Sequence, residues 1–88
     1  MPDDIDIEPQ GDHEYLVIQA SELEDVRTWF RLTPEALDEI GSDDEEDVVR
    51  RTVQFLRRHQ DVADFPDVIE LEDVIASYDD YLPAMIGD

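Results

Sequence analysis

The sequence predicts an α+β fold that is predominantly helical, with an N-terminal β-hairpin or extended arm followed by three to four short helices in one small layer. Helix-capping residues precede apolar runs at several points, and apolar residues then recur at helical spacing. Strand-like composition is confined to the N-terminal part of the chain. The 88 residues, 41% of them hydrophobic, suffice for one domain with a modest core.

The N-terminal segment differs in composition from the rest of the chain. Residues 1–12 are expected to form either a flexible acidic N-terminus or the first hairpin strand, and residues 13–88 a single small helical domain. Isoleucines alternate with acids ahead of residues 8–11, whose Glu-Pro-Gln-Gly fits a type I turn, and residues 15–18 have strand composition. Pairing of these segments as a hairpin remains open, and residues 1–4 are expected to fray.

Two short helices are expected next. Ser21 and Glu24 form a capping box that predicts a helix running to about Arg31. Thr33 then stands as the N-cap of a helix of about two turns that begins with a proline, and Gly41 is suited to end it in a left-handed conformation.

The stretch GSDDEEDVVRRTVQFLRRHQ, residues 41–60, sorts acids before arginines. A capping box of Ser42 and Glu45 predicts a helix, and the charge order suits the helix dipole. One face of this helix is expected to be buried: Val48, Val49, Thr52, Val53, Phe55 and Leu56. Two i,i+4 ion pairs support it: Glu46 with Arg50 and Asp47 with Arg51.

The C-terminal part permits two interpretations. The first is a turn around residues 65–66, an N-cap at Asp67 and a helix that Pro83 ends. The alternative is a short strand over residues 68–71 leading into a helix from Glu72. The expected core of the whole domain is the following set: Val26, Trp29, Phe30, Leu37, Ile40, Val49, Val53, Leu56, Leu71, Val74, Ile75 and Tyr78.

No signature of an enzyme is present in the sequence. Cysteine is absent, the two histidines lie in different segments, and no phosphate-binding or zinc-binding motif occurs. We therefore expect no catalytic residues, no cofactor and no metal site. Because no apolar run has the length of a membrane span and the N-terminus is acidic, we expect a cytoplasmic protein without membrane contacts.

The charge composition indicates a binding role or an adaptation of the source. There are 26 acids and 6 basic residues, all arginine, which gives a net charge of -20. Such usage is expected from a GC-rich genome, and it also suits a cytoplasm at high salt, where charges are screened. The acidity can thus belong to the organism or to the function.

The expected function is that of a small acidic, non-enzymatic interaction or regulatory module that binds a protein partner, with a basic protein as one option. The alternative is a nucleic-acid mimic or nuclease inhibitor that binds a basic nucleic-acid-binding protein. Direct nucleic-acid binding is not expected, and a homo-oligomer is possible but not indicated.

Two groups of residues are candidates for binding the partner. Tyrosine is common among the residues that dominate interface energies, and aspartate attracts basic partners. The first group therefore lies at the end of the last expected helix: Tyr78, Asp79, Asp80 and Tyr81. The second group is the cluster of helix arginines: Arg50, Arg51, Arg57 and Arg58. The competing structural interpretation places Tyr78 in the core, lets Tyr81 pack the C-terminus and lets the arginines complete a capped helix.

Overall fold

The computed structural model describes residues 5–20, 24–61 and 64–86 of the chain. Its elements in chain order are β1 (Ile5–Gly11), β2 (Glu14–Gln19), β3 (Val26–Arg31), α1 (Pro34–Ile40), α2 (Glu45–Arg57), β4 (Val68–Glu70), α3 (Leu71–Ser77) and α4 (Tyr81–Ile86). The fold is α+β, but the expectation of a predominantly helical domain is wrong. Three strands precede the helices, and a fourth strand between the helices completes a four-stranded sheet.

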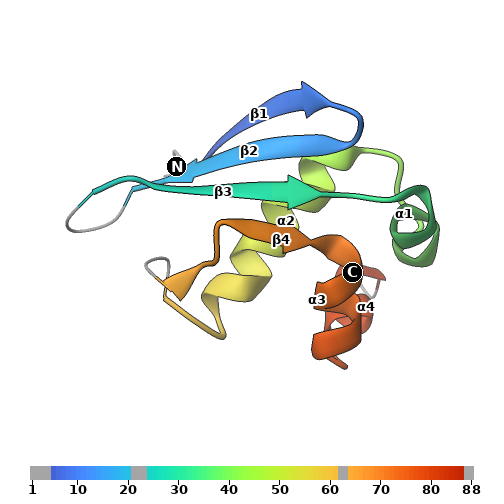
Figure 1. Ribbon diagram of the computed structural model, residues 1–88. Helices are drawn as coiled ribbons and strands as arrows, with labels where there is room; N and C mark the ends of the chain where they lie inside the picture. The colour runs from blue at the N-terminus through green and yellow to red at the C-terminus, as the bar shows by residue number, and fades with distance from the viewer. Residues whose placement is uncertain (1–4, 21–23, 62–63, 87–88) are drawn as a thin grey trace.

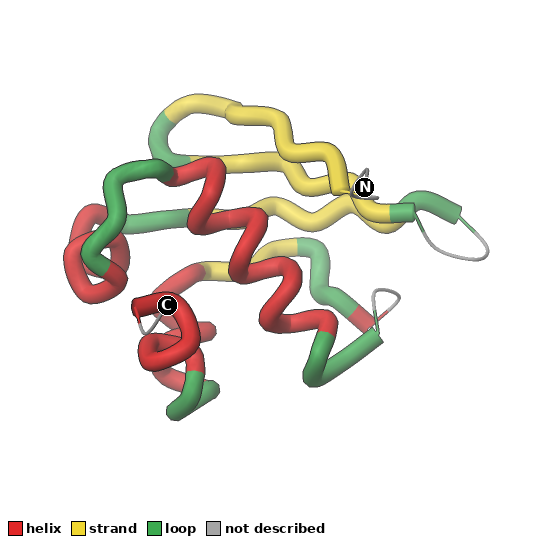
Figure 2. The backbone as a smooth tube through the Cα atoms, turned by 180° about the vertical axis from the view of Figure 1, so that it is seen from behind, coloured by secondary structure: helices red, strands yellow, loops and turns green. Residues whose placement is uncertain are grey.

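The sheet has the strand order β1-β2-β3-β4. Its first three strands are antiparallel neighbours, and β4 adds to β3 in parallel. The strands lie in front of α2 in Figure 1, whereas α2 crosses in front of the strands in the opposite view of Figure 2. The described helices therefore cover one face of the sheet and leave the other face open.

The N-terminal hairpin, one of the two expected alternatives, is present, but its turn lies elsewhere. Residues 8–11 belong to β1, so the type I turn expected there is wrong. The chain reverses at Asp12 and His13, whose φ angles of 53° and 63° are both positive. A two-residue loop of this conformation is the type I′ turn, whose twist matches that of the paired strands. The expected fraying of residues 1–4 lies outside the described residues.

The helix expected to run to Arg31 is wrong, because Val26–Arg31 forms β3. Thr28 and Phe30 are buried, whereas the residues that alternate with them point to the open face: Arg27, Trp29 and Arg31. Valine, threonine, tryptophan and phenylalanine all favour strands. The polar Thr28 on the buried side hides the two-residue period, so that the apolar residues alone suggest a helix. Ser21 of the expected capping box lies outside the described residues.

The next two helices agree with the sequence more closely. Thr33 accepts a hydrogen bond from the backbone N–H of Ala36 at 3.1 Å, and Gly41 ends α1 at φ 82°, as predicted. The capping box of Ser42 is wrong, because α2 is capped by Asp44, whose side chain accepts from the backbone N–H of Asp47 at 3.2 Å. The predicted buried face of α2 is confirmed at every position.

The C-terminal part follows the alternative interpretation of a strand leading directly into a helix. β4 occupies residues 68–70 and α3 follows without a loop, so the helix expected from an N-cap at Asp67 is wrong. Pro83 lies in the first turn of α4 and does not end a helix. A proline is tolerated there because the first N–H groups of a helix have no partner within it.

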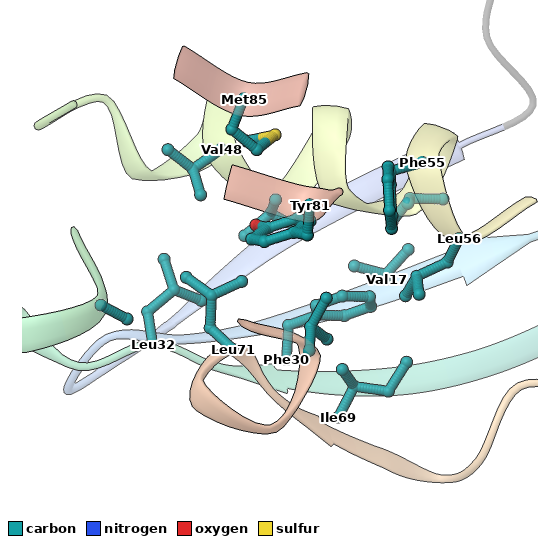
Figure 3. Packing of buried hydrophobic residues seen from close by; sticks show 14 of the residues in the cluster. Val17, Phe30, Leu32, Val48, Phe55, Leu56, Ile69, Leu71, Tyr81 and Met85 are labelled. Carbon is teal, nitrogen blue, oxygen red and sulfur yellow. The ribbon is translucent and has the colours of Figure 1, made fainter. Parts of the chain in front are cut away.

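The core lies between the sheet and α2, with α4 closing it. Figure 3 shows Tyr81 at its centre, among side chains of α2 and α3. Of the expected core, seven residues are buried: Phe30, Ile40, Val49, Val53, Leu56, Leu71 and Val74. Four more pack against it half-buried: Val26, Leu37, Ile75 and Tyr78. The prediction that Trp29 belongs to the core is wrong, because Trp29 is 39% exposed.

Candidate functional site

An apolar row crosses the open face of the sheet. Leu16 on β2 pairs with Trp29 on β3, and Trp29 pairs in turn with Val68 on β4. Alternation along each strand places these three side chains, with Ile18, on the face away from α2. Trp29 is 39% exposed and Val68 42%, while the other two are half-buried. We call Leu16, Ile18, Trp29 and Val68 the sheet face.

Charged residues surround the sheet face. The strand register places Asp6 and Glu8 of β1 beside Ile18 and Leu16. The remaining charged side chains of the same face are Glu14, Arg27, Arg31 and Glu70. Arg31 pairs with Glu14 at 3.4 Å, and both side chains are well exposed, so this ion pair adds little stability. The result is an apolar centre with a mostly acidic rim, which is the distribution found in protein interfaces.

Sequence reasoning missed this surface because it assigned Trp29 to a helix. The signal that could have found it is the alternation in VRTWFR, in which Arg27, Trp29 and Arg31 share one side of a strand. A tryptophan between two arginines on such a strand lies on the face that a core does not cover.

The expected tyrosine and aspartate group is only partly on the surface. Tyr81 is fully buried, and burial raises its pKa to about 12. The half-buried ring of Tyr78 lies 4.9 Å from the ring of His59, and His59 approaches the exposed Asp80 at 3.8 Å. Asp79 is exposed as well. The structure thus keeps three of the four residues near the surface and places Tyr81 in the core.

The four arginines do not form one common surface. Arg50 pairs with Glu46 at 3.5 Å, and Arg51 pairs with Asp47 at 3.9 Å, which confirms the two predicted i,i+4 ion pairs. Two guanidinium groups also bind other elements: Arg51 donates to the carbonyl of Met85 at 3.0 Å, and Arg57 donates to Gln19 Oε1 at 2.8 Å. Arg58 is exposed at the end of α2.

Glu45 joins the hairpin to the start of α2. Its carboxylate lies 2.9 Å from Nδ1 of His13 and accepts a hydrogen bond from the Tyr15 hydroxyl at 3.1 Å. Burial, followed by this hydrogen bond and the neighbouring negative charges, raises the pKa of Tyr15. Such an arrangement holds the hairpin against the helix.

In the described part of the chain, no three His, Asp or Glu side chains are placed so as to hold a metal ion. None of the helices described is long and apolar enough to cross a membrane. Comparison with protein families, with curated proteins and with solved structures finds no match to this chain.

Proposed function

We propose that the protein is an acidic, non-catalytic interaction module that binds a basic protein partner through the sheet face. The observation that carries the proposal is the exposed indole of Trp29 at the centre of an uncovered sheet. Tryptophan is enriched among the residues that dominate binding energy at protein interfaces. An apolar row on an open sheet would also lose its contact with water on binding.

Charge selects the kind of partner. The chain has a net charge of -20, and Asp6, Glu8 and Glu70 contribute to the rim of the sheet face. A basic protein is attracted by this field, whereas a second copy of the chain is repelled by it. Because Arg27 and Arg31 interrupt the acids on the same face, the rim differs from the uniform charge of a nucleic acid. We therefore favour a basic protein with apolar contact residues over strict nucleic-acid mimicry.

Paired capture experiments test the proposal. Wild type, Trp29→Thr and Ile86→Thr are immobilised and exposed to source-cell extract; Ile86 is a control because it is 56% exposed on α4. A basic protein should be retained by wild type and Ile86→Thr and lost by Trp29→Thr. The purified protein should then change the Trp29 fluorescence and cross-link to β2 or β3. Circular dichroism should show that all three proteins are folded.

Two results would contradict the proposal. Equal retention by all three proteins would place binding outside the sheet face. Sedimentation equilibrium that shows a dimer of the wild type, lost in Trp29→Thr, would make a second copy of the chain the occupant of this face.

A further inference from the structure

A pocket opens at the free edge of β4, between the end of α2 and α3. Its volume is about 170 Å³, which suits a single side chain better than a small-molecule ligand. The deepest lining is apolar, because Leu56, Ile69 and Val74 are all buried. The pocket therefore offers an apolar surface to the aliphatic part of a ligand.

The polar lining of the pocket carries only negative charge. Glu70 and Asp73, three residues apart, are both exposed and line the pocket. No described residue that lines it is cationic, and neither carboxylate forms an ion pair within the described chain. Arg31, which neighbours Glu70 in the strand register, pairs with Glu14 instead. Two carboxylates are thus available beside an apolar floor.

Tyr78 provides an aromatic wall with a fixed orientation. The ring of Phe55 meets it edge-on, with centroids 5.5 Å apart and planes at 84°. The imidazole of His59 lies 4.9 Å away on the same aromatic cluster. Because neighbouring rings hold Tyr78, little side-chain entropy would be lost when a ligand packs against it.

We propose that this pocket binds an arginine side chain of the partner. The aliphatic stem would lie on the apolar floor and the guanidinium between Glu70 and Asp73. Arginine fits better than lysine because its planar, weakly hydrated guanidinium can bond two carboxylates and stack on an aromatic ring. The identity of the ligand as part of a protein rests on the proposed function. Val68 supports the connection, because it belongs to the sheet face and also lines the pocket.

The proposal can be tested without the partner. Isotope-labelled protein is titrated with N-acetyl-arginine amide and followed by amide chemical shifts in NMR spectra. The shifts should concentrate at Glu70, Asp73 and Tyr78, with binding in the millimolar range. The neutral analogue N-acetyl-citrulline amide should bind about tenfold more weakly or worse, because it has lost the charge-assisted hydrogen bonds.

Two double variants separate the pocket from general acidity. Glu70→Gln with Asp73→Asn should weaken binding of the arginine compound about tenfold or more. Glu35→Gln with Asp38→Asn removes the same residue types at the same spacing from α1 and should leave binding unchanged. Equal shifts with the citrulline compound, or equal loss in both double variants, would overturn the proposal.

The outcomes for the pocket and for the sheet face are distinguishable. Binding of the arginine compound at the pocket, together with capture that does not depend on Trp29, would remove only the sheet-face proposal. Capture that depends on Trp29, without binding of the arginine compound, would remove only the pocket proposal.

Discussion

The hydroxyl of Tyr81 donates a hydrogen bond of 2.6 Å to Oγ1 of Thr52 in the interior of the domain. The direction of this hydrogen bond follows from a second contact of Thr52, whose Oγ1 lies 2.7 Å from the carbonyl oxygen of Val48. A carbonyl can only accept, so the single hydroxyl proton of Thr52 goes to Val48 and Tyr81 must be the donor. This bond joins α4 to α2 through a tyrosine that is fully buried.

The buried tyrosine predicts a loss of stability at alkaline pH. Burial raises the pKa of Tyr81 to about 12, against an ordinary value of 10. Because the folded state favours the neutral form of Tyr81, its contribution to the free energy of unfolding is fully present below pH 10. This contribution is lost as the pH rises from 10 to about 12. The difference corresponds to roughly 3 kcal/mol of unfolding free energy. The raised pKa of Tyr15 acts in the same direction. Denaturant unfolding at increasing pH measures the effect.

Two Tyr→Phe variants control this prediction. Tyr81→Phe should lower the free energy of unfolding at neutral pH by about 1 kcal/mol and flatten its alkaline dependence. Tyr78→Phe should leave both close to wild type, because the Tyr78 hydroxyl forms no hydrogen bond among the described residues. An unchanged alkaline dependence in Tyr81→Phe would contradict the assignment.

The sequence predicts helix α2 well and strand β3 poorly, for a physical reason. In α2 every buried position is apolar or a threonine, so the helical period is unmistakable. In β3 the buried side carries Thr28 and the open side carries Trp29, which reverses the usual distribution. The partner strands compensate for this reversal, because Val17 lies opposite Thr28. The strand itself could have been recognised from its alternation, but the pairing with β2 that compensates for Thr28 is not visible in these six residues.

The sheet face could not be predicted for the same reason, because the sequence analysis placed a helix where β3 lies. Once β3 is known, the register places Leu16 and Val68 on either side of Trp29. The pocket is less accessible to sequence reasoning, because it needs the end of α2 beside β4 and α3. These segments meet through the parallel pairing of β4 with β3, a contact between residues about forty positions apart, and through the ring contact of Phe55 with Tyr78.

The net charge of -20 predicts a strong dependence of stability on salt. Exposed carboxylates occur on β1, β4, α1, α2 and α3, so their repulsion opposes the compact state. The Debye length falls from about 30 Å at 0.01 M to about 3 Å at 1 M salt, and the melting midpoint should rise steadily over this range. Equal ionic strengths of sodium chloride and sodium sulfate should act alike if screening is the cause, whereas a much larger effect of sulfate would indicate its exclusion from the surface. A midpoint that is independent of salt would contradict the prediction.

Arg57 is predicted to stabilise the fold, and its neighbour Arg58 is not. Arg57 Nε donates to Oε1 of Gln19, a fully buried residue whose Nε2 has no partner among the described residues. Arg57→Met keeps the aliphatic stem and removes the donor, which should lower the free energy of unfolding by about 1–3 kcal/mol because Oε1 is left unsatisfied. Arg58→Met removes the same charge from an exposed position and should change it by less than about 0.5 kcal/mol.

A third variant separates the hydrogen bond from the charge. Glutamine carries its amide nitrogen at the same distance along the side chain as Nε of arginine, so Arg57→Gln can still donate to Gln19. It should therefore recover a large part of the stability lost in Arg57→Met, although both variants remove the same charge. Chemical denaturation of the three variants decides the matter. If Arg57→Gln is as unstable as Arg57→Met, the guanidinium charge matters more than the hydrogen bond to Gln19. If both Arg57 variants are as stable as wild type, Arg57 does not stabilise the fold and is available to bind a partner.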